Sequence, residues 1–123
     1  MIASRLRTLT DEELVAEFEN WARVHGHNVV DGEVRDTKLS YRQLNAIDEE
    51  LRARGPTARL GLIRLLDHPE LAVRYYAASW SLAVEPGRAR TVIEAVRNLG
   101  PISLAGDAGM TLRMLDDGTF KPT

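Results

Sequence analysis

Two histidines separated by one glycine come closest in this sequence to a metal-binding pattern. His25 and His27 are followed by Asp31 and Glu33, and imidazole and carboxylate groups are both ligands of zinc. Short histidine spacings are weak motifs on their own, however, and His25 falls at the edge of an apolar helix face. We therefore favour a hydrogen-bonded packing histidine, and we expect neither a metal nor another cofactor.

The third histidine lies in a turn, between Asp67 and a proline. His68 with a neighbouring carboxylate has the composition of a general base, but a turn histidine that caps the following helix is the commoner arrangement. Ser79 and Ser81 lack a nucleophile-elbow or serine–lysine motif, and no phosphate loop or dinucleotide fingerprint is present. We therefore expect no enzyme, and one that relies on a histidine is the least supported alternative.

Composition narrows the class of protein further. The 123 residues suit a single domain, 1–123, that buries its own core, and the absence of cysteine excludes disulfides. With 16 basic and 18 acidic residues the net charge is −2, which disfavours nucleic acid as a partner. No apolar run suits a signal peptide or a membrane span, so we expect a cytoplasmic protein with no membrane contact.

The elements that must position any site are helices, and the central one stands out. The segment from Leu66 to Val84 predicts a turn followed by a helix that is apolar on nearly every side. One face carries Val73, Tyr76, Ala77, Trp80, Ala83 and Val84, and the opposite face carries Leu71, Ala78 and Leu82. Such a helix must pack on more than one side, with Trp80 in a structural role.

The rest of the chain predicts helices of a simpler kind. Thr10 and Glu13 form a capping box for a first helix that should stop near Gly26, and residues 27–36 are expected to connect it to the next. Further helices are expected over about 38–54, 57–66 and 87–98, with a weak sixth one around 108–115. The outer helices are apolar on one side and the middle two almost all round, which favours stacked helical hairpins over a bundle.

Residues 66–78, Leu-Asp-His-Pro-Glu-Leu-Ala-Val-Arg-Tyr-Tyr-Ala-Ala, resemble the turn and second helix of a HEAT repeat, and residues 55–66 fit its first helix. This resemblance implies an all-α fold, a short right-handed α–α superhelix (a HEAT-like or armadillo-like solenoid) of about three helical hairpins. It also implies a structural pairing of Arg74 with Asp67, with Glu70 as a competing partner.

The chain as a whole resembles a small bacterial family catalogued as domain of unknown function 2019. The resemblance is carried by residues 66–84, by Gly100-Pro-Ile-Ser-Leu, by Ala108-Gly-Met and by the Asp-Gly-Thr-Phe-Lys-Pro ending. It implies a HEAT-like or armadillo-like helical fold and no established activity.

These features favour a non-catalytic binding or scaffold module whose partner is another protein. By analogy with HEAT-like solenoids, the second helix of each pair lines a concave binding face. The candidate binding face consists of Arg42, Asn45, Glu49, Arg74, Tyr75 and Arg113. A toxin-neutralising immunity protein and a HEAT-like nucleic-acid module are the alternatives, and incompletely covered end faces leave room for a homodimer.

Overall fold

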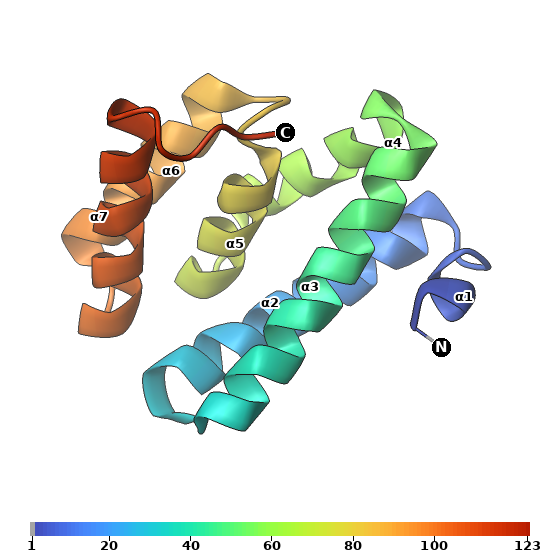
Figure 1. The fold of residues 1–123 in the computed structure, drawn as a ribbon, viewed down its shortest axis with the longest axis horizontal. Helices are drawn as coiled ribbons and strands as arrows, with labels where there is room; N and C mark the ends of the chain where they lie inside the picture. The colour runs from blue at the N-terminus through green and yellow to red at the C-terminus, as the bar shows by residue number, and fades with distance from the viewer. Residues whose placement is uncertain (1) are drawn as a thin grey trace.

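The chain folds into helices joined by short connections (Figure 1). The structure is a computed structural model that describes residues 2–123, and this part of the chain is all-α, without strands. Its elements are α1 (Ile2–Leu6), α2 (Asp11–Asp31), α3 (Val34–Arg54), α4 (Pro56–Arg59), the 3₁₀ helix η1 (Leu60–Asp67), α5 (Leu71–Ser81), α6 (Pro86–Leu99) and α7 (Ile102–Asp116). None of these described helices has the length and apolarity needed to cross a membrane.

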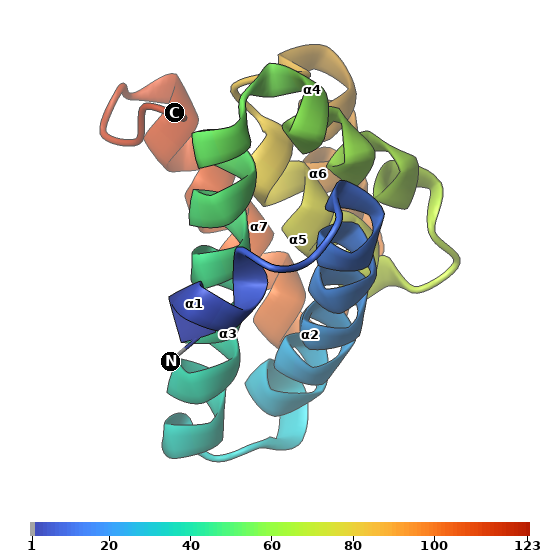
Figure 2. The same ribbon diagram turned by 90° about the vertical axis from the view of Figure 1, so that its right-hand side faces the viewer.

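Helix α5 lies in the middle of the molecule. It packs on η1, on α6 and on α2, while the long helices α2 and α3 pair with each other on one side and α6 with α7 on the other (Figures 1 and 2). Val73 and Ala77 are completely buried, Leu82 retains 4% exposure, and Leu71 is half-buried. The prediction that this helix packs on more than one side is confirmed.

The α2–α3 connection is shorter than the sequence predicts. The capping box is present, with Thr10 accepting from the Glu13 N–H at 3.1 Å, but α2 runs past Gly26 to Asp31. The expected connection over residues 27–36 is therefore wrong, because Val29 packs against the core and only Gly32 and Glu33 separate the two helices. Gly26 is a contact point instead: a Cβ there would overlap the Ala72 side chain on α5.

The expected third helix is present, but its first turn is α-helical and the rest of it is a 3₁₀ helix. Pro56 opens α4 after Gly55, whose φ of 109° suits glycine, and the chain tightens into η1 from Leu60. A 3₁₀ helix repeats every three residues, so Leu62 and Leu65 fall on one face, and both are buried.

Near both ends of the described chain, at Ile2–Leu6 and Ile102–Asp116, the structure has more helix than the sequence predicts. The weak sixth helix is a full helix of 15 residues, α7, because Leu104, Ala108 and Leu112 pack on α6 despite the interior glycines. At the other end, α1 forms because Leu6 is completely buried. Packing outweighs helix propensity in both segments.

Candidate binding groove

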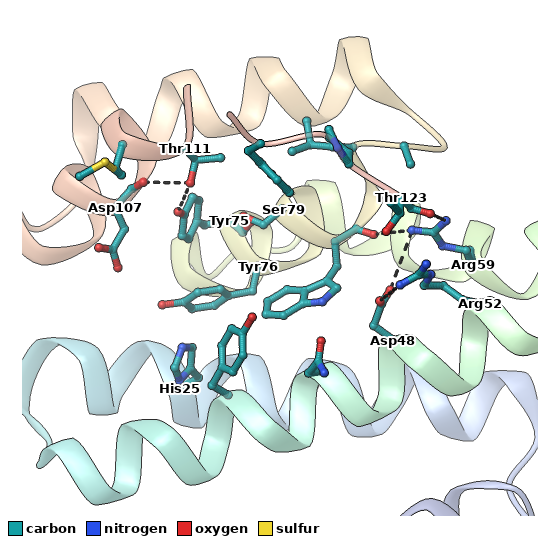
Figure 3. Close-up of a pocket in the computed structure, with 18 residues that line it drawn as sticks. His25, Asp48, Arg52, Arg59, Tyr75, Tyr76, Ser79, Asp107, Thr111 and Thr123 are labelled. Carbon is teal, nitrogen blue, oxygen red and sulfur yellow. Dashed lines mark hydrogen bonds and ion pairs between the residues drawn. The ribbon is translucent and has the colours of Figure 1, made fainter. Parts of the chain in front are cut away.

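A groove of about 510 Å³ lies between α3 and α7, with α5 as its floor (Figure 3). Side chains from several elements line it: His25, Tyr41, Asn45, Asp48, Arg52, Arg59, Tyr75, Tyr76, Ser79, Trp80, Leu82, Ala83, Asp107, Met110, Thr111, Phe120, Pro122 and Thr123. Its volume is within the range of ligand pockets. The groove is therefore the first candidate for a functional site.

Helix α3 supplies one wall through a stripe of polar and aromatic residues. Tyr41, Asn45, Asp48 and Arg52 are spaced three or four residues apart, so they share one helix face. The core face of the same helix carries Leu44, Ile47 and Leu51, all completely buried. Burial of this apolar stripe fixes the rotation of α3 and turns the other four residues toward the groove.

Aromatic rings from α5 form the floor. The ring centroids of Tyr75 and Tyr76 are 5.0 Å apart, those of Tyr76 and Trp80 are 6.4 Å apart, and Tyr41 from α3 lies 5.6 Å from Trp80. Trp80 also meets Phe18 of α2 edge to face, with the ring centroids 5.9 Å apart. Tyr41 is 50% exposed, so the floor presents an aromatic surface at the mouth of the groove.

Helix α7 supplies the opposite wall. The Tyr75 hydroxyl lies 3.1 Å from the Thr111 hydroxyl, which ties the floor to this wall, and burial raises the Tyr75 pKa. Asp107 stands at the same end of the groove, where partial burial raises its pKa (Figure 3). This end therefore combines a carboxylate with two hydroxyl groups.

At the other end of the groove, a buried carboxylate lies between two arginines. Asp48 is 4% exposed, and its carboxylate oxygens are each 3.9 Å from a guanidinium nitrogen, one of Arg52 and one of Arg59. These distances allow charge attraction but are too long for hydrogen bonds, and Asp48 Oδ1 has no hydrogen-bond partner. Burial raises the Asp48 pKa to about 6, although both arginines act in the opposite direction.

Arg59 is held by main-chain oxygens. Its guanidinium donates to the carbonyl oxygen of Trp80 at 3.2 Å and to the main-chain oxygen of Thr123 at 2.9 Å, while its Nε has no partner. The hydroxyl of Tyr76 is also buried without a partner, and burial raises its pKa. The groove thus leaves an acceptor, a donor and a hydroxyl group unsatisfied.

Of the three histidines, His25 is a packing residue and His68 a turn residue. His25 is buried, its Nδ1 lies 2.7 Å from the Ser40 hydroxyl, and burial lowers its pKa, which favours the neutral imidazole. His27 is exposed, and residues 2–123 bring together no group of three or more potential metal ligands. His68 accepts from the Glu70 N–H at 3.0 Å and contacts the Glu19 carboxylate at 2.7 Å, so both ring nitrogens are engaged.

Two residues of the candidate binding face line the groove, and the others do not. Asn45 and Tyr75 contribute to it, whereas Arg42, Glu49 and Arg113 are exposed outside it. Arg74 is half-buried, also outside the groove. Asp48, Arg59 and Asp107 were missed: the spacing from Tyr41 to Arg52 signals a polar stripe on α3, but nothing in the sequence links Arg59 to it.

The expected pairing of Arg74 with Asp67 is wrong. Arg74 donates to the carbonyl oxygen of His68 at 2.8 Å, which fastens the turn before α5. Asp67 has an 84% exposed side chain and pairs with Arg88 at 3.2 Å. Glu70, the competing partner, pairs with Arg23 at 2.7 Å. A main-chain oxygen satisfies Arg74 because it lies closer than either carboxylate.

Fold and site together define an all-helical protein with an aromatic-floored groove. The chain belongs to the family described as domain of unknown function (DUF2019), whose model matches residues 12–116. That range includes nearly all of α2 and continues to the last residue of α7. The helices that form the groove are thus part of the family fold.

A solved structure extends this comparison. The chain is similar to the crystal structure of the protein RPA1889 from Rhodopseudomonas palustris CGA009, with 36% sequence identity and a TM-score of 0.88. The similarity covers 96% of this chain and 98% of that one. No curated protein matches the chain.

Proposed function

We propose that this chain is a non-catalytic binding module that recognises another protein through the groove between α3 and α7. The observation that carries the proposal is the open aromatic floor, where half-exposed Tyr41 lies beside Trp80. Aromatic side chains in a concave surface offer a large contact area with little loss of side-chain freedom, and they often anchor protein interfaces.

The order of the helices supports a scaffold of the HEAT-like or armadillo-like kind. Taken in pairs, α2 with α3, η1 with α5 and α6 with α7 correspond to about three hairpins of a short right-handed α–α superhelix. In such a scaffold the second helices line the concave side. Here the second helices are α3, α5 and α7, and these three supply most of the lining of the groove.

The chemistry of the groove also favours binding over catalysis. Its histidine, His25, contacts Ser40 through Nδ1 and lies with its ring 4.8 Å from that of Tyr76. Ser79 donates to the carbonyl oxygen of Tyr75 at 2.9 Å, and neither hydroxyl nor imidazole is arranged as a nucleophile with its base. A packed aromatic and polar surface suits recognition of a partner.

The test is selection of random linear peptides displayed on phage against the immobilised full chain. We expect enriched peptides that bind the free protein in titration calorimetry. Tyr41→Ala should weaken them by about tenfold, since loss of an aromatic anchor at an interface costs about 1–2 kcal/mol. Leu99→Ala is the matched control, because Leu99 is 77% exposed and lies outside the groove.

Two outcomes would contradict this function. One is a selection that enriches no peptide above an unrelated protein. The other is a set of peptides whose affinity is unchanged by Tyr41→Ala, since their binding surface would then lie elsewhere. Circular dichroism of both variants separates loss of binding from loss of fold.

A further inference from the structure

Asp48, Arg52 and Arg59 form one end of the groove, the polar end, and two groups of opposite kinds are unsatisfied there. Asp48 Oδ1 is an acceptor and Arg59 Nε is a donor, and both are buried without a hydrogen-bond partner. The Tyr76 hydroxyl is also buried without a partner, but it points away from Asp48, toward His25 (Figure 3). Each such group loses its hydrogen bonds to water on folding without gaining a replacement, which destabilises the folded state. A ligand that supplies both donors and acceptors would recover part of this loss.

Charge narrows the chemistry of that ligand. The groove is lined by two arginines and two aspartates, Arg52, Arg59, Asp48 and Asp107, whose formal charges cancel. A phosphate at the polar end would meet the Asp48 carboxylate, and a cation would meet both arginines. A polypeptide main chain fits better, because it carries one donor and one acceptor per residue and no net charge.

In the structure, a main-chain group of the protein itself already occupies the position beside Arg59. Arg59 Nη1 donates to the main-chain oxygen of Thr123 at 2.9 Å, and Thr123 lies beside Arg59 and Asp48 (Figure 3). Asp48 Oδ1 still has no donor, so residues 121–123 satisfy only one half of the pair.

This tail is also lightly attached. Within residues 2–123, the contact with Arg59 is the single hydrogen bond made by residues 121–123. The preceding residue is fixed more firmly: the Phe120 N–H donates to the Met114 carbonyl at 3.0 Å, and its ring packs against the core. Residues 121–123 are therefore held by fewer hydrogen bonds than the chain up to Phe120.

We propose that the groove binds an extended segment of the partner protein through its main chain, in place of residues 121–123. One carbonyl oxygen of the segment accepts from Arg59, and a nearby N–H donates to Asp48 Oδ1. The aromatic floor between the polar end and Asp107 takes a side chain of the same segment. This inference rests on the proposed function. It adds the extended conformation of the bound segment and the two side chains, Arg59 and Asp48, that would hydrogen-bond to its main chain.

The experiment uses a peptide selected on the full chain, with its amides replaced by esters one position at a time. An ester removes a single N–H donor and leaves the side chains unchanged. We expect one position at which the ester weakens binding to the wild type by about tenfold. Against Asp48→Ala the same ester should change the affinity by less than about twofold, because the acceptor is already missing.

Arg42→Ala is the matched control, because Arg42 is an exposed residue of α3 outside the groove. With this variant, the tenfold effect of the ester should persist. A second measurement needs no variant: in wild-type protein labelled with ¹⁵N, the peptide should move the Thr123 amide resonance toward its unfolded position. The Phe120 amide should keep its folded position.

The outcomes distinguish the inference from the proposed function. An ester series without effect, for a peptide that Tyr41→Ala still weakens, overturns main-chain recognition and leaves the binding module standing. A peptide insensitive to Tyr41→Ala contradicts both. The Thr123 resonance could instead shift with protein concentration alone, while light scattering shows a dimer. In that case the groove binds a second copy of this chain, and the proposal is wrong.

Discussion

Asp48 shows how a single residue sets the character of the groove. Leucine and isoleucine neighbours on α3 are completely buried, and the rotation they impose places the Asp48 carboxylate in the interior as well. Two arginines 3.9 Å away do not compensate for the lost hydration, so the Asp48 pKa rises to about 6. The residue is kept in a state that is unfavourable for stability, which is common at functional sites.

The raised Asp48 pKa predicts a pH-dependent stability. Between about pH 4 and pH 6 the folded protein binds more protons at Asp48 than the unfolded chain, so its contribution to the free energy of unfolding falls as the pH rises. Asp48→Asn cannot ionise, and we expect the variant to be more stable than wild type at pH 7 by roughly 1–3 kcal/mol. The difference should shrink toward zero near pH 4, as measured by urea denaturation at both values.

Asp31→Asn, at an exposed aspartate, is the matched control for the substitution itself. An Asp48→Asn protein that is less stable than wild type at pH 7 would mean that attraction to Arg52 and Arg59 outweighs the effect of burial. The assignment of the pKa shift to burial would then be wrong.

At the scale of the elements, the contact between α2 and α5 accounts for the glycine inside α2. Glycine is a common helix stop, yet α2 continues through Gly26, where the missing side chain lets Ala72 of α5 approach closely. In α7, Gly106 has open space around its Cα instead. Both glycines lie inside helices, but only Gly26 permits a close contact between two helices.

This difference predicts opposite effects of the same substitution. Gly26→Ala forces α2 away from α5, and overpacking of about 1–3 kcal/mol should exceed the gain in helix propensity of about 1 kcal/mol. Gly106→Ala should stabilise the protein by up to about 1 kcal/mol, since the new methyl group meets nothing within 4 Å. Thermal unfolding of the two variants measures both effects, and a stabilised Gly26→Ala protein would show that the two helices separate freely.

At the scale of the whole molecule, the groove is formed by helices that are distant in sequence. Tyr41 of α3, Trp80 of α5 and Thr111 of α7 meet only because α5 lies between the two outer helix pairs. Much of the arginine charge is neutralised outside the groove, as in the pairs of Arg5 with Glu17 and Arg90 with Asp116. With 16 basic and 18 acidic residues, the chain as a whole has no excess of positive charge for a polyanion.

This charge distribution predicts weak binding to nucleic acid. With a net charge of −2, we expect labelled duplex DNA to bind with a Kd above about 10⁻⁴ M at roughly 0.15 M salt. Fluorescence anisotropy measures this directly, and the binding of a selected peptide under the same conditions is the comparison. Micromolar binding to DNA that weakens steeply with salt would favour the nucleic-acid alternative.

The sequence alone determined the helical class, the capped start of α2 and the apolar character of α5, because these depend on local spacing and on neighbours within one turn. It also placed Asn45 and Tyr75 on a candidate binding face. Only the tertiary structure decided that α2 continues through Gly26, that α7 is a full helix and that Arg74 holds a carbonyl oxygen. It alone brought Arg59 to Asp48. These features depend on contacts between helices far apart in the chain, where burial and close approach outweigh local preference.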